Sequence, residues 1–185
     1  MITAQQALDR LREGNRRFVA GTGSVARHVD ATAGQAPFAI VLGCSDSRVP
    51  VEIVFDQGVG DLFVVRVAGN VAAPSQVGSI EFAAENFGTR LVVVLGHTGC
   101  GAVRATLESC ERPTALSPGL QDIVDRIRPS VESGDDPVRA NIRASVKELQ
   151  VGSQTLGRLV QREGLLIVGA EYSLETGVVD FFDRR

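Results

Sequence analysis

Apolar residues gather in four short runs along the chain, and segments with helical spacing lie between them. These runs are rich in Val, Ile, Leu and Phe and cover residues 38–43, 62–67, 91–96 and 165–170. Their length and composition predict strands that are mostly buried on both faces. A fifth run, VVDFF (178–182), follows the turn SLETG and predicts an antiparallel edge strand.

Helical patterns alternate with these strands. Their ends are marked by a capping box at Thr3 and Gln6, by Pro74 and Gly88, and by Pro137 and Gly164, and one more helix begins after Cys100. This alternation predicts an α/β fold, in which helices flank a central, mostly parallel sheet of four parallel strands plus an antiparallel edge strand. The Pro-, Gly- and Ser-rich segments 111–119 and 132–137 are typical of loops.

Length and composition narrow the classes of function. A chain of 185 residues favours one domain, here 1–185, with residues 1–35 as an N-terminal helical arm. The net charge is −3, basic residues are scattered, and Trp is absent, so we expect no nucleic-acid partner. No apolar run approaches the ~18 residues of a membrane span, and an odd count of three cysteines is typical of a reducing compartment. We therefore expect a cytoplasmic protein with no membrane partner.

Soft metal ligands lie directly after two of the predicted strands. Cys44 follows the first strand, and His97 and Cys100 follow the third. Ligands of open α/β sheets bind at the carboxyl ends of strands, where the strand order reverses. If the first and third strands are neighbours at that point, these three side chains meet at one metal. The helix that begins after Cys100 also favours a thiolate at its N-terminus.

Three protein ligands are typical of catalytic zinc, which keeps its fourth position for water. The other candidate ligands are Cys110, about 15 Å further along the helix, and His28, in a predicted loop. We expect neither to share the metal. A single cysteine at a strand end is usually a small buried hydrophobe, but two such cysteines with a nearby histidine favour a metal site.

Asp46 and Arg48 lie on the loop after Cys44. The carboxylate is a possible fourth zinc ligand in a closed state, or it accepts a hydrogen bond from zinc-bound hydroxide while Arg48 holds it. The simpler alternative is an ordinary loop ion pair. A phosphatase loop does not fit, because such a loop needs five residues between Cys and Arg and this chain has three. The segment from Gly96 to Gly101 also lacks the Lys-Ser/Thr that follows a phosphate-binding loop.

The segments CSDSRVP, DLFVVRVAGN and VVVLGHTGCGAV together closely resemble the signature of the β-class carbonic anhydrases. The resemblance implies one Zn²⁺ per chain on Cys44, His97 and Cys100, with Asp46 and Arg48 as the catalytic pair. It implies a lyase that hydrates carbon dioxide reversibly to bicarbonate and a proton. It also implies a homodimer or homotetramer with an N-terminal helix that reaches onto a partner subunit.

The spacing further resembles the plant-like branch of that family. Its pocket Gln and Phe are matched by Gln35, nine residues before Cys44, and Phe63, nineteen after it, and Gly101 matches the position after the last ligand. Phe82 stands where plant-like members carry a pocket Tyr. Gln35 is positioned by this resemblance to donate a hydrogen bond to the substrate oxygen that gains charge.

Two alternatives use the same ligands. One is a hydrolase of carbon disulfide or carbonyl sulfide, and the other is a non-catalytic zinc-binding protein of the same fold. Assays with carbon dioxide and with the sulfur compounds distinguish the hydrolase from a carbonic anhydrase. The Asp46–Arg48 pair argues against the non-catalytic protein, because a structural site needs no oriented water.

Overall fold

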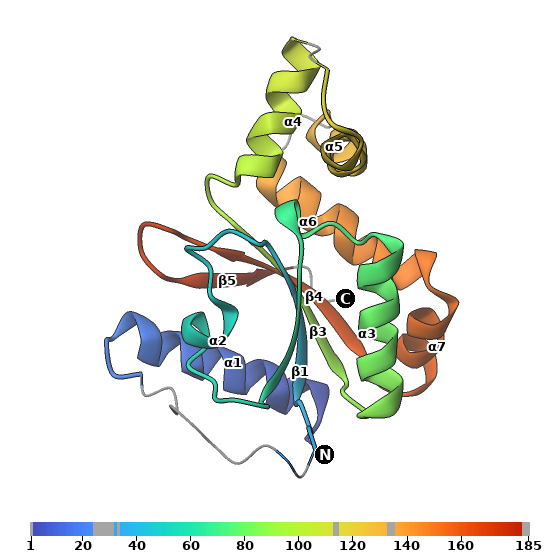
Figure 1. Ribbon diagram of the computed structural model, residues 1–185. Coiled ribbons are helices and arrows are strands. Elements are labelled where there is room, and N and C mark those ends of the chain that lie inside the picture. Colours follow the sequence, from blue (N-terminus) through green and yellow to red (C-terminus); the bar gives the residue numbers. More distant parts are fainter. Residues whose placement is uncertain (1, 24–31, 33, 113–114, 133–135, 183–185) are drawn as a thin grey trace.

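The computed structural model describes residues 2–23, 32, 34–112, 115–132 and 136–182, and Figure 1 shows a twisted sheet with helices on both faces. Within these residues the sheet has the order β2-β1-β3-β4-β5. Its strands are β1 (Ala39–Gly43), β2 (Leu62–Arg66), β3 (Leu91–His97), β4 (Leu166–Tyr172) and β5 (Val179–Phe182). The first four are parallel and β5 pairs antiparallel with β4, which confirms the predicted α/β fold.

The helices are α1 (Ala4–Val19), α2 (Val51–Val54), α3 (Pro74–Asn86), α4 (Gly101–Glu111), α5 (Pro118–Val131), α6 (Pro137–Lys147) and α7 (Gln154–Arg162). A 3-10 turn, η1 (Ala68–Asn70), follows β2, and a π turn, η2 (Glu148–Gly152), joins α6 to α7. None of the helices in the described residues is both long enough and apolar enough to cross a bilayer.

Two hydrophobic layers hold the helices on the sheet. On one face, α1 and α2 pack against alternate strand residues such as Val41 and Val93. On the other, α3, α6 and α7 pack against the intervening residues, such as Ile40 and Val92. Because side chains alternate between the faces of a strand, continuous apolar runs supply both layers. Helices α4 and α5 pack on each other beyond the carboxyl ends of the strands (Figure 1).

Helix α1 belongs to the core of its own chain. The predicted capping box is confirmed, because the side chains of Thr3 and Gln6 each accept a hydrogen bond from the other residue's backbone N–H. Leu8 and Leu11 of α1 are fully buried in the layer against the sheet. Asn15, near the end of α1, donates to the carbonyl oxygens of Val54 and Gly177. The described part of the N-terminal segment is therefore anchored on this chain, and contact with a partner subunit stays a prediction.

The prediction of one continuous helix from Pro137 to Gly164 was wrong. The helix stops at Lys147, passes through the π turn η2, and restarts after Ser153, whose backbone is extended (φ −107°, ψ 117°). The Ser153 hydroxyl accepts a hydrogen bond from the N–H of Leu156 and donates to Glu81 of α3. Ser competes for helix hydrogen bonds and favours N-caps, and the preceding Gly152 has low helix propensity, so the break is built into the sequence.

Helix α5 was not predicted, although the segment before it was correctly expected to be a loop up to Ser117. Its buried face carries Val124 and Ile127 at helical spacing. Pro129 lies inside the helix and masks the pattern, since Pro is disfavoured in helix interiors. His28 and residues 113–114 and 133–135 of the two predicted loops lie outside the described residues.

Candidate metal centre

The sheet brings the predicted ligands to one edge. Strand β1 pairs in parallel with β2 on one side and with β3 on the other, so the strand order reverses at β1, as predicted. Gly43 is level with Leu95, which places Cys44, the next residue, near His97 at the end of β3. Cys100 then precedes α4 as its N-cap. Residues more than fifty positions apart therefore meet because two strands are neighbours.

The three donor atoms form a compact cluster. The sulfur atoms of Cys44 and Cys100 are 4.0 Å apart, and the ligand atoms of Cys44, His97 and Cys100 all lie within 4.8 Å of one another. With Zn–S bonds of about 2.3 Å, a tetrahedral zinc holds two sulfurs at roughly 3.8 Å from each other. All three side chains are buried. Their spacing and residue types fit a zinc ion.

The imidazole of His97 is prepared for a metal. Its Nδ1 lies 3.0 Å from the carbonyl oxygen of Thr98, and the N–H of Thr98 in turn donates to the carbonyl of Tyr172 on β4. A proton on Nδ1 leaves the lone pair of Nε2 free. This Nε2 is buried and has no hydrogen-bond partner among the described residues. A buried nitrogen without a partner is costly, and a metal ion beside the two sulfurs satisfies it.

Without a metal, the two thiols share their protons unequally. The hydrogen bond from the Cys100 thiol lowers the pKa of Cys44 to about 4, with further help from His97. The same contact and burial raise the pKa of Cys100 above its usual range. Burial acts to lower the pKa of His97, but the contact with Cys44 and its negative charge outweigh it, so that pKa is raised. The cluster therefore carries a thiolate on Cys44 at neutral pH and retains the proton of Cys100, which a metal must displace.

Asp46 lies beside the cluster and is held by Arg48. Its Oδ1 accepts from the backbone N–H and the Nε of Arg48, each at 2.9 Å, and its Oδ2 accepts from Arg48 Nη2 at 2.7 Å. That Oδ2 is also 3.7 Å from His97 Nε2. The Arg48 side chain keeps the pKa of Asp46 far below its usual range, so the carboxylate stays charged at any working pH. One carboxylate oxygen thus faces the cluster while the arginine holds the other side of the group.

Arg66, at the end of β2, is a site residue that the sequence reasoning missed. Its Nε donates to the carbonyl oxygen of Cys44 at 2.9 Å, and its Nη2 donates to that of Asp46 at 2.7 Å. The guanidinium therefore fixes the backbone of the loop that carries both residues. Its one sequence signal is that Arg66 is the single charge in an otherwise apolar strand. Its place level with Gly43, directly before Cys44, is seen only in the folded chain.

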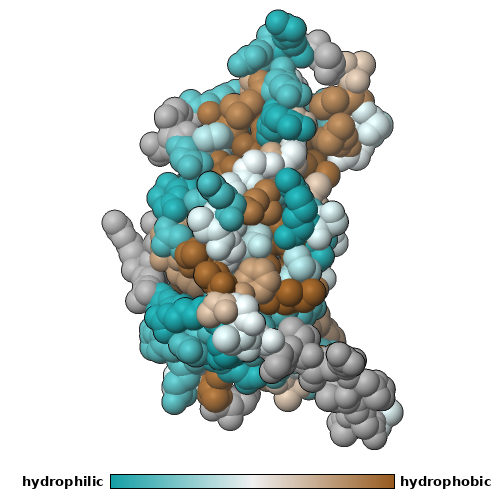
Figure 2. All heavy atoms as spheres, turned by 90° about the vertical axis from the view of Figure 1, so that its left-hand side faces the viewer, coloured by the Kyte–Doolittle hydropathy of each residue, from teal (hydrophilic) through white to brown (hydrophobic). Residues whose placement is uncertain are grey.

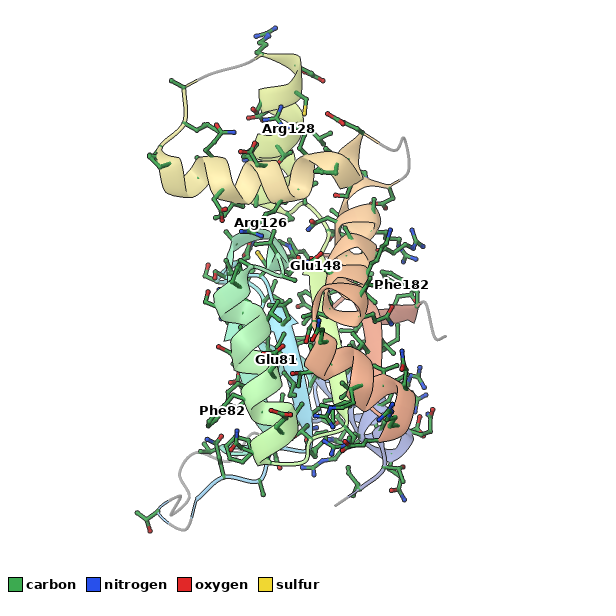
Figure 3. The ribbon with its side chains drawn as sticks, turned by 90° about the vertical axis from the view of Figure 1, so that its right-hand side faces the viewer. Glu81, Phe82, Arg126, Arg128, Glu148 and Phe182 are labelled. Carbon is green, nitrogen blue, oxygen red and sulfur yellow. The ribbon has the colours of Figure 1, made fainter. Side chains whose placement is uncertain are left out.

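The predicted pocket residues divide into two groups within one chain. Gly101 begins α4 next to the ligand Cys100. Phe63, in contrast, is level with Ile40, four residues before Cys44 and therefore roughly 13 Å away along the strand. Phe82 packs near Phe63, with ring centroids 6.4 Å apart. Figure 3 shows Phe82 on the part of α3 that lies away from α4 and α5. Gln35 is exposed on the segment that enters the start of β1. A single chain does not bring these three to its own metal cluster.

The third cysteine is separate from the site, as predicted. Cys110 is exposed near the end of α4, whereas Cys44 and Cys100 are buried, and all three are free thiols.

Comparison with known proteins gives the family. A family model described as carbonic anhydrase matches residues 39–179, which include every residue of the metal cluster. The chain belongs to the carbonic anhydrase family. The curated relatives below carry the name carbonic anhydrase, which favours carbon dioxide hydration over the two alternatives that use the same ligands.

Curated relatives agree with this assignment. The chain is 41% identical to carbonic anhydrase 2 of Mycobacterium tuberculosis, over 90% of this chain and 87% of the relative. It is 40% identical to a carbonic anhydrase of Mycolicibacterium smegmatis, over 92% and 89% of the two chains.

Solved structures share the fold. The β-carbonic anhydrase CcaA superposes with a TM-score of 0.74 at 27% identity and covers 97% of this chain and 86% of its own. Two tetrameric β-carbonic anhydrases from Sordaria macrospora give a match with a TM-score of 0.74 at 20% identity, over 96% and 92% of the chains, which shows the common fold. The chain is thus a β-class carbonic anhydrase that hydrates carbon dioxide and binds zinc through Cys44, His97 and Cys100.

Replacement of a ligand should remove the metal. We expect Cys44→Ser, His97→Ala and Cys100→Ser each to lose zinc together with carbon dioxide hydration, because three ligands leave no redundancy. Zinc per chain and stopped-flow hydration, measured on the same samples, check this. Cys110→Ser is the matched control and should keep both. Full zinc occupancy in Cys100→Ser would contradict the site.

Zinc binding should release protons. Because the pKa of Cys100 is raised, its thiol keeps its proton at neutral pH in the metal-free protein, and zinc must displace it. Zinc affinity should therefore fall as the pH falls. Calorimetric titration of zinc in buffers with different protonation enthalpies should give at least one proton released per zinc. An affinity that does not change with pH, without proton release, would contradict this.

Proposed function

We propose that Asp46 and Arg48 are the catalytic pair of this carbonic anhydrase, and that Asp46 acts on the water that attacks carbon dioxide. The support is the pattern of hydrogen bonds. Arg48 donates two hydrogen bonds to Oδ1 of Asp46 and one to Oδ2, so Oδ2 can accept a further hydrogen bond. This Oδ2 is also the oxygen that lies 3.7 Å from the buried Nε2 of His97.

The chemistry divides between metal and protein. Zinc, when bound, supplies a Lewis acid that makes a nucleophile from water near neutral pH. Asp46 Oδ2 accepts a hydrogen bond from the attacking water and so directs the lone pair of the water oxygen toward the carbon of the substrate. Arg48 keeps the carboxylate charged and holds it so that it faces the ligand cluster without joining it. Without that hold, Asp46 would be free to serve as a fourth zinc ligand in a closed state.

Asp46→Asn should separate catalysis from metal binding. An amide can donate to the water and misorient it, while no ligand is removed, so we expect normal zinc content and a rate about 10–100-fold lower. Zinc analysis and stopped-flow hydration check this. Arg48→Ala should also slow the reaction, because it frees Asp46 to move onto the metal.

The chain offers a matched control for that experiment. Asp122 and Arg126 of α5 form a two-bond pair of the same type on the surface, so Asp122→Asn breaks an equivalent contact outside the site. It should leave the rate unchanged. If Asp46→Asn behaves like Asp122→Asn, the Asp46–Arg48 contact is only a loop ion pair.

We further propose that Gln35, Phe63, Phe82 and Gly101 line the substrate pocket, in the arrangement of the plant-like branch. The spacing of Gln35 and Phe63 from Cys44 supports this assignment. The apolar Phe63 and Phe82 suit a small uncharged substrate, and Gln35 would donate to the oxygen that gains charge. Phe82 brings no hydroxyl, unlike the Tyr of plant-like members.

This pocket requires a second copy of the chain. Gln35, Phe63 and Phe82 do not reach the metal cluster of their own chain, so they can meet a cluster only across a subunit interface. Phe82 is 51% exposed and its ring packs with those of Phe63 and Phe87, at centroid distances of 6.4 and 5.5 Å, so an aromatic cluster reaches the surface here. Figure 2 shows further apolar side chains at the surface of another face, in its upper and middle parts. We therefore propose a homodimer or a homotetramer as the active form, which the tetrameric proteins of similar fold support.

A charge at Phe82 should weaken both assembly and catalysis. In Phe82→Asp we expect a smaller molecular mass by light scattering and slower hydration, with zinc content per chain unchanged. Val151 lies in η2, is 76% exposed, and provides a control in Val151→Asp, which should change neither mass nor rate. A Phe82→Asp protein with wild-type mass and wild-type rate would remove Phe82 from the pocket.

We also propose that residues 1–185 form a single domain that works in the cytoplasm. The shared sheet and its two continuous hydrophobic layers support one domain. Three free thiols, one of them exposed, support a reducing compartment.

A further inference from the structure

The turn η1 touches the metal cluster from a part of the sequence that has no assigned role. Gly69, in its middle, donates its backbone N–H to the sulfur of Cys44 at 3.4 Å, within the range of a hydrogen bond to sulfur. Such a bond draws negative charge from a thiolate and fixes its direction. The position of the Gly69 peptide therefore influences how strongly Cys44 donates to a metal.

Gly69 is held in a conformation that only glycine adopts easily. Its φ is +71°, and a Cβ at this position would lie 2.7 Å from Ile127 of α5 and 3.1 Å from Ala102 of α4. The backbone is thus wedged against the helices that extend beyond the sheet. These apolar contacts limit movement in one direction, but they supply no hydrogen bond that sets the orientation of the peptide.

Asn141 supplies that hydrogen bond. It lies on α6, is only 2% exposed, and donates its Nδ2 to the carbonyl oxygen of Gly69 at 2.8 Å. The two bonds of Gly69 act on its two flanking peptide groups, with the carbonyl held by Asn141 and the N–H directed at Cys44. Asn141 lies more than seventy positions from Gly69 in the sequence. In the fold, only Gly69 stands between Asn141 and the metal ligand Cys44.

We propose that Asn141 is a positioning residue of the metal centre, which holds the Gly69 N–H on the Cys44 sulfur and so tunes the donor strength of that thiolate. Asn141 touches neither substrate nor metal. Without its amide the carbonyl of Gly69 loses its buried donor, the turn relaxes, and the hydrogen bond to sulfur lengthens. The assignment depends on Cys44 being a metal ligand and not on the role proposed for Asp46, so the two are tested separately.

The test uses the full chain loaded with Co²⁺ or Zn²⁺. In Asn141→Leu, a substitution of similar size that removes the donor, the sulfur becomes richer in electrons. The thiolate-to-cobalt charge-transfer band should therefore move to lower energy than in the wild type. Zinc should also leave about 10–100-fold faster when a chelator is added, because the Cys44 sulfur is no longer held in position and this loss of orientation outweighs its richer electron density.

Asn15 provides the matched control. It is also a buried asparagine that donates to backbone carbonyl oxygens, those of Val54 and Gly177, but it lies on α1 at the opposite face of the sheet. Asn15→Leu should lower the melting temperature and leave the cobalt band and the zinc release rate unchanged. This separates loss of stability from a change at the metal.

The outcomes decide the proposal. A shifted band and faster release in Asn141→Leu alone support it. An unchanged band and unchanged release in the folded variant overturn it, as do equal changes in Asn15→Leu. Should Asn141→Leu fail to fold, Asn141→Ala removes the same donor to the Gly69 carbonyl without adding bulk. It should then shift the band in the same direction, and an unshifted band in this variant also overturns the proposal.

Discussion

Parallel pairing of β1 with β3 is the constraint on which the rest of this molecule depends. It joins the ends of two buried strands and places Cys44 beside His97, and the turn after β3 then brings Cys100 into the same small volume. The pairing is held by apolar side chains on both faces, so the core that stabilises the sheet also fixes the metal ligands. A shift of register by one residue would turn each strand's core side chains to the opposite face and would separate the ligands.

The electrostatics of the centre follow from that convergence. Two sulfur atoms and an imidazole in a buried cluster are a costly arrangement without a cation, and the unpaired Nε2 of His97 marks where the cation belongs. Two arginines act on the loop that follows Cys44. Arg48 holds the carboxylate of Asp46, and Arg66 holds the carbonyl oxygens of the same loop. The protein thus supplies a fixed set of dipoles and charges around a single metal position.

The sequence predicted the elements whose signals are local. Continuous apolar runs indicated all five strands, and the position of Cys44 and His97 at strand ends indicated the metal site. The break between α6 and α7 was missed because Leu149 and Leu156 keep a helical spacing across it, although Gly152 and Ser153 mark it. Helix α5 was missed because Pro129 hides its period.

Residues that act through the backbone were the hardest to foresee. Arg66 and Asn141 bind carbonyl oxygens, and a carbonyl leaves no mark in the sequence, so their partners become visible only when the chain is folded. The pocket residues pose the opposite problem. Gln35, Phe63 and Phe82 were identified by resemblance, and the fold places them away from the cluster of their own chain, so their function depends on an interface that one chain does not contain.

X-ray absorption at the zinc edge of the purified protein tests the central claim most directly, because it counts the atoms that surround the metal. The account predicts two sulfur neighbours at about 2.3 Å and nitrogen or oxygen neighbours at about 2.0–2.1 Å, in four-coordinate geometry. A spectrum with one sulfur, with none, or with more than two would contradict a centre built from Cys44, His97 and Cys100.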